Sequence, residues 1–143
     1  MKKDLYRIID ANLNRSREGL RVCEEIVRFA LSSPALTKEL KSVRHEVSLI
    51  AKTHYKKTGA LSCARDSSSD VGRVSRKPSE MRRSSFCDIF TANAQRAKES
   101  LRVLEEFYKL TDKKISMRFS HLRFRVYEIE RKASGRIEAL RNN

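Results

Sequence analysis

The chain has 143 residues and a formal charge of +14, because 32 Lys and Arg outnumber 18 Asp and Glu. That length is typical of one ordinary domain, and the charge predicts a surface that attracts anions: a nucleic-acid backbone, an acidic membrane face or phosphorylated small molecules. Only four Gly and two Pro interrupt regular structure, which favours a few long helices and excludes a β-sandwich. We expect residues 1–143 to form a single helical domain.

The cysteines and the apolar pattern indicate the compartment. Cys23, Cys63 and Cys87 have no CxxC spacing and leave an odd thiol, so neither a disulfide framework nor a zinc site is predicted. The first residues are basic but are not followed by an apolar run of signal-peptide length, and no stretch is long and apolar enough to span a bilayer. A cytoplasmic protein without membrane association is therefore expected.

Proline divides the first half of the chain into two helical stretches. Pro34 ends a first stretch that begins between Lys3 and Ala11, since the residue before a proline is disfavoured in a helix. A second periodic stretch runs over residues 35–57. Two helices joined by so short a turn predict a helical hairpin.

The second half repeats this organisation after a long connection. Residues 58–79 are rich in Gly, Ser, Asp and Arg and show little periodicity, which predicts a long functional loop. A third helical stretch covers residues 80–110. After a break at residues 111–112, a fourth begins at residue 113, and residues 134–143 are expected to fray.

An internal repeat relates the two hairpins. Residues 11–25 are echoed without a gap by residues 92–106, with identity at Ala, Asn, Arg, Glu, Leu, Arg, Val and the closing Glu pair. The partner helices match more weakly, at residues 43–45 and 122–124. The repeat units, residues 5–57 and 80–135, therefore predict an all-α fold: a four-helix bundle of two pseudo-symmetric αα-hairpins joined by the loop over residues 58–79.

Polar side chains interrupt the apolar arc of the first repeat. At about 100° per residue, Asn12 and Arg15 fall inside the arc and Glu18 lies on its flank. A buried polar group must find a partner or water, because burying it unpaired costs on the order of several kcal/mol. The equivalent side chains of the second repeat are Asn93, Arg96 and Glu99.

Two interpretations of these side chains stay open. They could pair across the repeats as a buried network that fixes helix register, or the bundle could open into a polar pocket that they line. Arg21 and Glu24, by contrast, point more nearly outward. Surface i,i+4 ion pairs are expected on both helices: Arg21 with Glu25, and Arg102 with Glu106.

The segment ARDSSSDVG, residues 64–72, is a second polar constellation. Its aspartates Asp66 and Asp70, its hydroxyls and Arg65 could supply magnesium ligands, backbone amides and a cation for phosphate oxygens. The alternative is a Ser/Asp-rich turn with local side-chain caps, which composition alone favours.

His45, beside Arg44 on the second expected helix, is a further polar candidate. It could orient a substrate or carry a proton, although a lone histidine beside a helix face is more often a satisfied boundary residue. The sequence has no Gly-rich Walker loop, kinase Gly loop, HExxH or GxSxG motif. Nucleotide binding would therefore follow an unconventional route.

Several separated motifs in one order resemble a known family. They are RIIDAN from Arg7, REGLRV from Arg17, RH at Arg44, ARD at Ala64, DVG at Asp70, AN at Ala92 and LRVLEE from Leu101. Together they are similar to the helical domain found alone or fused ahead of thiamin-phosphate synthase barrels. That family is associated with hydroxymethylpyrimidine phosphate kinase activity. The resemblance implies ATP-dependent phosphorylation of this compound to its diphosphate, in thiamin biosynthesis.

The resemblance also implies roles for the cationic and acidic residues. Guanidinium groups match phosphate oxygens bidentately, and the phosphate clamps would be Arg15, Arg44, Arg65 and Arg96. Asp66 and Asp70 would hold Mg²⁺, and either could act as a general base. His45 would complete the catalytic set.

The remaining candidates would bind the pyrimidine substrate. Asn12 and Asn93 would contact the aminopyrimidine edge or its phosphate, while Glu18 and Glu99 would orient the arginines. Ser67 departs from the threonine expected after Arg-Asp, but it keeps the hydroxyl group. The loop chemistry is therefore preserved.

Without a barrel of its own, the chain would act separately from thiamin-phosphate synthase, which is its expected protein partner. A homodimer is weakly favoured. Two alternatives remain: a basic helical nucleic-acid-binding module, supported only by net charge and lacking any recognised reading motif, and a non-catalytic partner that docks on the synthase.

Overall fold

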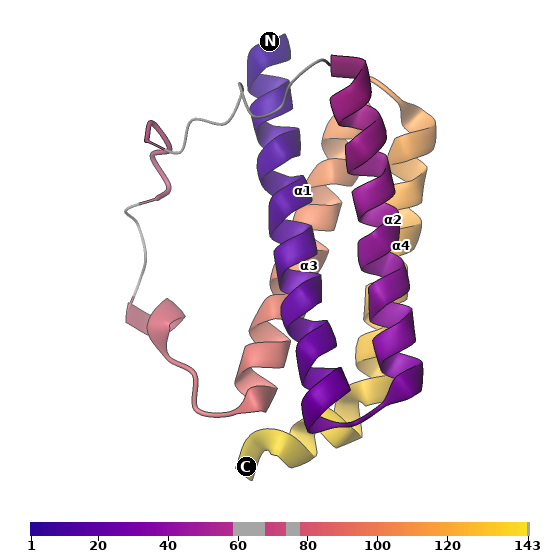
Figure 1. Cartoon of the computed structure of the whole chain (residues 1–143). Helices are drawn as coiled ribbons and strands as arrows, with labels where there is room; N and C mark the ends of the chain where they lie inside the picture. The colour runs from indigo at the N-terminus through magenta and orange to yellow at the C-terminus, as the bar shows by residue number, and fades with distance from the viewer. Residues whose placement is uncertain (59–67, 74–77, 143) are drawn as a thin grey trace.

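The computed structural model describes residues 1–58, 68–73 and 78–142, and this part of the chain contains helices and no strand. The long helices are α1 (Lys2–Glu25), α2 (Pro34–Thr58), α3 (Phe86–Tyr108) and α4 (Lys113–Glu138) (Figure 1). The predicted all-α four-helix bundle is confirmed. Among the described helices, none combines the length and the apolar character that crossing a membrane requires.

The helices form two antiparallel hairpins that pack side by side. α1 pairs with α2, α3 pairs with α4, and the largest interface between the hairpins joins α1 to α3, with α2 against α4 beside it. α1 and α3 run in opposite directions, so the two hairpins are related by an approximate two-fold axis (Figure 1). The described parts of the long connection pass on the α1–α3 side of the bundle.

The first hairpin turns where the sequence predicts it. After α1 the chain makes a π-helical turn, Ile26–Ala30, and Ser32 adopts a positive φ of 48°. Ser33 then begins α2, because its side-chain oxygen accepts from the Leu36 N–H at 3.4 Å while Pro34 takes the first helical position. The missing N–H of a proline is unpaired there in any case.

The third helix begins later than residue 80, and that prediction is wrong. A short 3₁₀ turn, Pro78–Met81, precedes an extended Ser85 whose side chain accepts from the Asp88 N–H. This N-cap fixes the start of α3 at Phe86. Asp112 caps α4 in the same way, through the N–H groups of Lys114 and Ile115, as the predicted break requires.

Residues 134–142, the described part of this end, are helical, so the prediction of fraying is wrong for them. α4 extends to Glu138 and is followed by a 3₁₀ turn, Ala139–Asn142. Ile137 and Leu140 are buried against the core, and Arg141 contacts Asp88 at the start of α3. The apolar side chains hold this end of the chain to the bundle.

The crossing of α1 and α3 is close because of one glycine. A Cβ atom on Gly19 would lie 2.8 Å from the carbonyl oxygen of Asn93 and 3.4 Å from the backbone nitrogen of Ala97. In the repeat, Ser100 takes the place of Gly19 and Ser16 takes that of Ala97. The two-fold axis therefore passes between Ser16 and Ala97, with the apolar core on either side of it.

Candidate functional site

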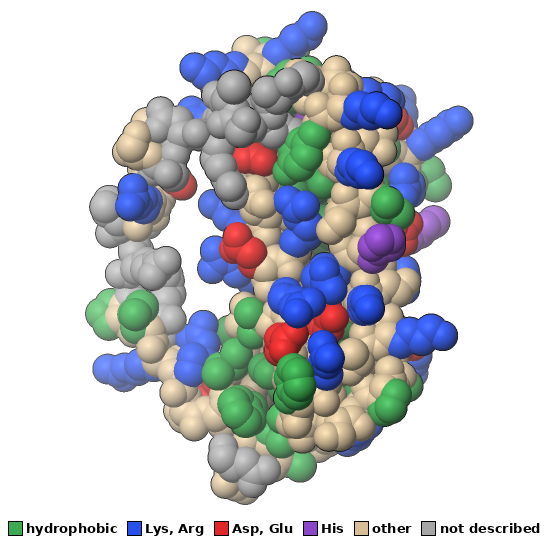
Figure 2. Space-filling model, viewed as in Figure 1, with side chains coloured by type: hydrophobic (Ala, Val, Ile, Leu, Met, Phe, Trp, Pro, Cys, Tyr) green, Lys and Arg blue, Asp and Glu red, His purple; other side chains and the backbone are tan. Residues whose placement is uncertain are grey.

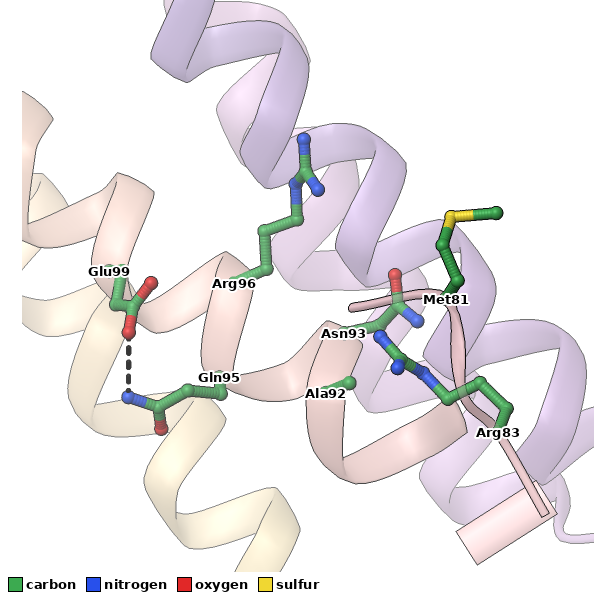
Figure 3. A pocket seen from close by; sticks show the side chains of 7 residues that line it. All are labelled: Met81, Arg83, Ala92, Asn93, Gln95, Arg96 and Glu99. Atoms are coloured by element: carbon green, nitrogen blue, oxygen red, sulfur yellow. Dashed lines mark hydrogen bonds between the residues drawn. The ribbon is translucent and has the colours of Figure 1, made fainter. Parts of the chain in front are cut away.

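A hollow of about 380 Å³ opens on α3, beside the segment that leads into this helix (Figure 3). A volume of a few hundred Å³ suits a small ligand. The hollow is lined by Met81, Arg83, Ala92, Asn93, Gln95, Arg96 and Glu99. The structure thus brings together Asn93, Arg96 and Glu99, which the sequence predicts as site residues, and adds Arg83.

The polar groups of the hollow are arranged along its length. Asn93 donates its amide to the Ile89 carbonyl at 2.8 Å, and Glu99 accepts from the Gln95 amide at 3.1 Å. Figure 3 shows Glu99 at one end and Arg83 at the other, with Arg96 projecting between them and away from Glu99. Glu99 therefore does not hold Arg96 in this structure, and the hollow presents a carboxylate and guanidinium groups at different places.

The first-repeat counterparts differ from one another in exposure. Asn12 is buried and donates to the Ile8 carbonyl at 2.8 Å, whereas Arg15 and Glu18 are exposed. The prediction that Arg15 lies inside the apolar arc is wrong, because its side chain is exposed while its neighbour Ser16 takes the buried position on α1. Within the described chain, the side-chain hydrogen bonds of Asn12 and Asn93 stay inside their own helices, so no buried network joins them across the repeats.

Arg44 lies in an ion pair between α1 and α2 and does not line the hollow. Its Nε and Nη2 donate to Glu24 at 2.7 and 3.3 Å, and Glu24 is only 2% exposed. The prediction that Glu24 points outward is therefore wrong, because it faces α2. Arg123 and Glu105 repeat the pair between α4 and α3 at 3.2 Å. A phosphate-binding role for Arg44 stays a prediction.

The surface ion pairs predicted on both helices are confirmed. Arg21 contacts Glu25 at 3.0 Å, and Arg102 contacts Glu106 at 2.9 Å. Figure 2 shows basic and acidic side chains gathered along the seam between α1 and α2. Arg21 and Arg102 are thus each neutralised by a glutamate on their own helix.

The loop candidates are only partly described. Arg65, Asp66 and Ser67 lie outside the described residues, and their roles stay predictions. Asp70 is exposed, and its Oδ1 accepts from the Gly72 N–H at 2.9 Å in a local turn. His45 is exposed on α2 and does not line the hollow. In the ranges that the structure describes, no group of three His, Cys, Asp or Glu is placed to hold a metal.

A hydrogen-bonded cluster between α1 and α2 is not among the predicted site residues. Tyr55 donates its hydroxyl to Asp10 at 3.2 Å, and Arg17 donates to Tyr55 at 3.4 Å and to Asn14 at 2.9 Å. Asp10 is 4% exposed, and burial raises the pKa of Tyr55. The spacing of Asp10, Asn14 and Arg17 along one helix face is the signal that could have revealed the cluster.

Beneath this cluster lies a buried aromatic group. His54 and Tyr108 meet edge to face at 5.7 Å between ring centroids, and Tyr108 stacks on Phe119. His54 Nε2 and the Tyr108 hydroxyl are buried without a hydrogen-bond partner in the described part of the chain. Burial lowers the pKa of His54, against the opposing effect of Asp10, and raises the pKa of Tyr108.

The fold and the hollow define an all-helical domain of two equivalent hairpins with an arginine-bearing site on one of them. The chain belongs to the ThiD2 family, which matches residues 7–132. This membership makes it a helical domain related to thiamine biosynthesis.

The curated relatives carry this domain within longer chains. Thiamine-phosphate synthase of Nostoc sp. (strain PCC 7120) is 44% identical over 92% of this chain and 36% of its own length. The enzyme of the same name from Thermosynechococcus vestitus is 43% identical over 88% of this chain and 34% of its own, and that from Rhodopirellula baltica is 34% identical over 93% and 36%. The chain thus spans about a third of the curated relatives it matches. No solved structure matches it.

Proposed function

We propose that the chain transfers a phosphoryl group from ATP to hydroxymethylpyrimidine phosphate, giving the diphosphate. The observation that carries the proposal is the hollow on α3, where Arg96 and Arg83 stand beside Asn93 and Glu99. The family resemblance supplies the substrate, and relatives named thiamine-phosphate synthase support the same pathway.

The polarity of the hollow suits this substrate. A phosphate ester would be held by the guanidinium groups, which form strong charge-assisted hydrogen bonds to phosphate oxygens. An aromatic amino group at the other end of the ligand would donate to Glu99, which Gln95 already orients. A ligand that is anionic at one end and a hydrogen-bond donor at the other matches this arrangement better than a uniformly anionic polymer.

The reaction itself asks for positioning and charge neutralisation. An oxygen of the acceptor phosphate attacks the γ-phosphorus of ATP, the bond from γ-phosphorus to the β–γ bridging oxygen breaks, and ADP leaves. The acceptor oxygen is largely ionised at pH 7, because the second pKa of a phosphate monoester is about 6. No general base is therefore required, and the role left to Asp66 and Asp70 is that of metal ligands.

Two aspartates of the long connection suit the binding of Mg²⁺, the expected cofactor. Mg²⁺ is usually bound through one or two carboxylates, waters and phosphate oxygens, so the exposed Asp70 could serve together with Asp66. The ion would neutralise charge on the transferring phosphate. Exposed guanidinium groups suit the polyphosphate of ATP.

A second candidate function is that of a non-catalytic partner of thiamine-phosphate synthase. It is favoured by the relatives, in which the matched segment forms about a third of a chain of that name. A separate chain of this kind would dock on the synthase without turnover of its own.

One assay separates the two candidates. The purified chain is incubated with hydroxymethylpyrimidine phosphate, ATP and Mg²⁺, and the diphosphate product is measured. We expect turnover, with an about 100-fold loss in Arg96→Ala, because the acceptor phosphate is then no longer held in place. We expect a comparable loss in Asp66→Ala, because it removes a ligand of the Mg²⁺ that would neutralise charge on the transferring group. Arg28→Ala, which removes an exposed arginine in the π-helical turn after α1, is the matched control.

The opposite outcomes are equally clear. A folded chain that gives no product but co-elutes with the synthase supports the docking function instead. A chain that does neither, and binds nucleic acid with a steep salt dependence, supports the nucleic-acid alternative.

A further inference from the structure

Arg15 and Arg96 occupy equivalent places at the crossing of α1 and α3. The two-fold axis passes between Ser16 and Ala97. Arg15 directly precedes Ser16, and Arg96 directly precedes Ala97. A two-fold rotation that exchanges two antiparallel helices lying side by side has its axis perpendicular to the plane that contains both helices. Such a rotation does not carry a side chain from one face of this plane to the other. Arg15 and Arg96 therefore lie on the same face of the α1–α3 pair.

Neither arginine is neutralised by the rest of the described chain. Both are exposed, and neither side chain makes an ion pair or hydrogen bond with a described residue. Arg21 and Arg102, on the same two helices, each contact a glutamate within 3.0 Å. Two guanidinium groups are thus left available on one face, where an anion would complete their hydrogen bonds.

The surroundings of the two arginines differ. Beside Arg96, the segment before α3 folds back and contributes Met81 and Arg83 to the wall of the hollow. Arg83 corresponds in the repeat to Lys2, which already belongs to α1, so the described residues at the start of this helix do not fold back beside Arg15 in this way. As far as the described residues show, Arg96 stands in a walled hollow and Arg15 stands on an exposed surface.

The asparagines next to the two arginines differ in exposure in the same way. Asn93 lines the hollow and can face a ligand, whereas Asn12 is only 5% exposed beneath the surface. Specific recognition of a small molecule needs a walled site with several polar groups. An extended polyphosphate needs chiefly accessible cations.

From this asymmetry we infer that the chain binds two phosphate-bearing ligands at once, one on each side of the two-fold axis. The Arg96 side takes the small phosphate ester, and the Arg15 side takes the polyphosphate of a nucleotide. The inference rests on the proposed function, because phosphoryl transfer requires donor and acceptor phosphates to lie next to each other.

Calorimetric titration tests the assignment without turnover. The ligands are a non-hydrolysable ATP analogue with Mg²⁺ and, separately, hydroxymethylpyrimidine phosphate. We expect Arg15→Ala to weaken the nucleotide by about tenfold or more and to leave the pyrimidine phosphate within about twofold, as loss of one charge-assisted contact predicts. Arg96→Ala should do the reverse, and Arg28→Ala should change neither.

Several outcomes would overturn the inference. They are an unchanged nucleotide affinity in Arg15→Ala, equal weakening of one ligand by both variants, mutual exclusion of the two ligands, or no nucleotide binding by the wild-type chain. Arg15→Lys, which keeps the charge, should recover part of the affinity and so exclude misfolding as the cause. Binding in the expected pattern without product would contradict the kinase proposal alone.

Discussion

The two hairpins share their packing and differ in their polar chemistry. Both place a buried glutamate of one helix against an arginine of its hairpin partner, Glu24 with Arg44 and Glu105 with Arg123. Among the residues that the structure describes, the hollow lies on the second hairpin and the cluster around Asp10 lies within the first. Features that occur twice belong to the fold, whereas features that occur once are where function has to be sought.

The duplicated ion pair gives the largest expected effect. Glu24→Ala should lower the free energy of unfolding by about 3 kcal/mol, because it leaves Arg44 half-buried without its partner. Glu105→Ala should cost less, since Arg123 contacts Glu105 at 3.2 Å and Arg44 contacts Glu24 at 2.7 Å. Urea unfolding of both variants checks the order, and equal losses would show that the two pairs are interchangeable.

The helix crossing gives the next effect. Gly19→Ala should destabilise the protein by about 2 kcal/mol, because the new methyl group meets the Asn93 carbonyl at the α1–α3 contact. Gly135→Ala is the control: nothing lies within 4 Å of its Cβ position on α4, so it should stabilise the helix by about 0.5–1 kcal/mol. A stable Gly19→Ala chain would mean that α1 and α3 can move apart freely.

The hydrogen-bonded cluster around Asp10, in the first hairpin, should give a smaller change in stability. Tyr55→Phe removes the hydroxyl that accepts from Arg17 and donates to Asp10, so unfolding should become easier by about 1 kcal/mol. Phosphate transfer is the second measurement. If turnover is unchanged while stability falls, the cluster has a structural role. If the rate of phosphate transfer also falls, the cluster contributes to the functional site.

The smallest effect depends on pH. Burial lowers the pKa of His54 in the folded chain below its ordinary value of about 6.5. At pH values between the folded and the unfolded pKa, the unfolded chain therefore binds more protons than the folded chain. Stability should therefore fall as pH drops through this window, by at most about 1.4 kcal/mol per pH unit. His54→Gln should flatten the difference in urea midpoint between about pH 7.5 and about pH 5.5. An unchanged slope would exclude His54 as its source.

The sequence predicts the fold because its signals are local. Pro34 and Asp112 mark helix boundaries through backbone chemistry, and the gapless repeat requires two similar hairpins. The predicted start of the third helix at residue 80 is too early. Residues 80–83 suit a helix by propensity, but the Ser85 cap decides the boundary.

The site was predicted only in part because its geometry is not local. Asn93, Arg96 and Glu99 follow from helix periodicity, but Arg83 reaches the hollow from a segment that folds back. Periodicity also could not show that Glu24 faces α2. The period of a helix gives the direction of each side chain around the helix axis, but it does not say which helix packs on that side.

The contact at Gly19 has a consequence for the ancestry of the chain. Since α1 and α3 cross about an approximate two-fold axis, each helix presents an equivalent surface to the other, as the subunits of a symmetric dimer do. Two copies of a single hairpin could bury an equivalent core by the same contact. A gene duplication that joined such copies would free each half to change separately, and the walled hollow beside one arginine and the open surface beside its counterpart would be the products of that freedom.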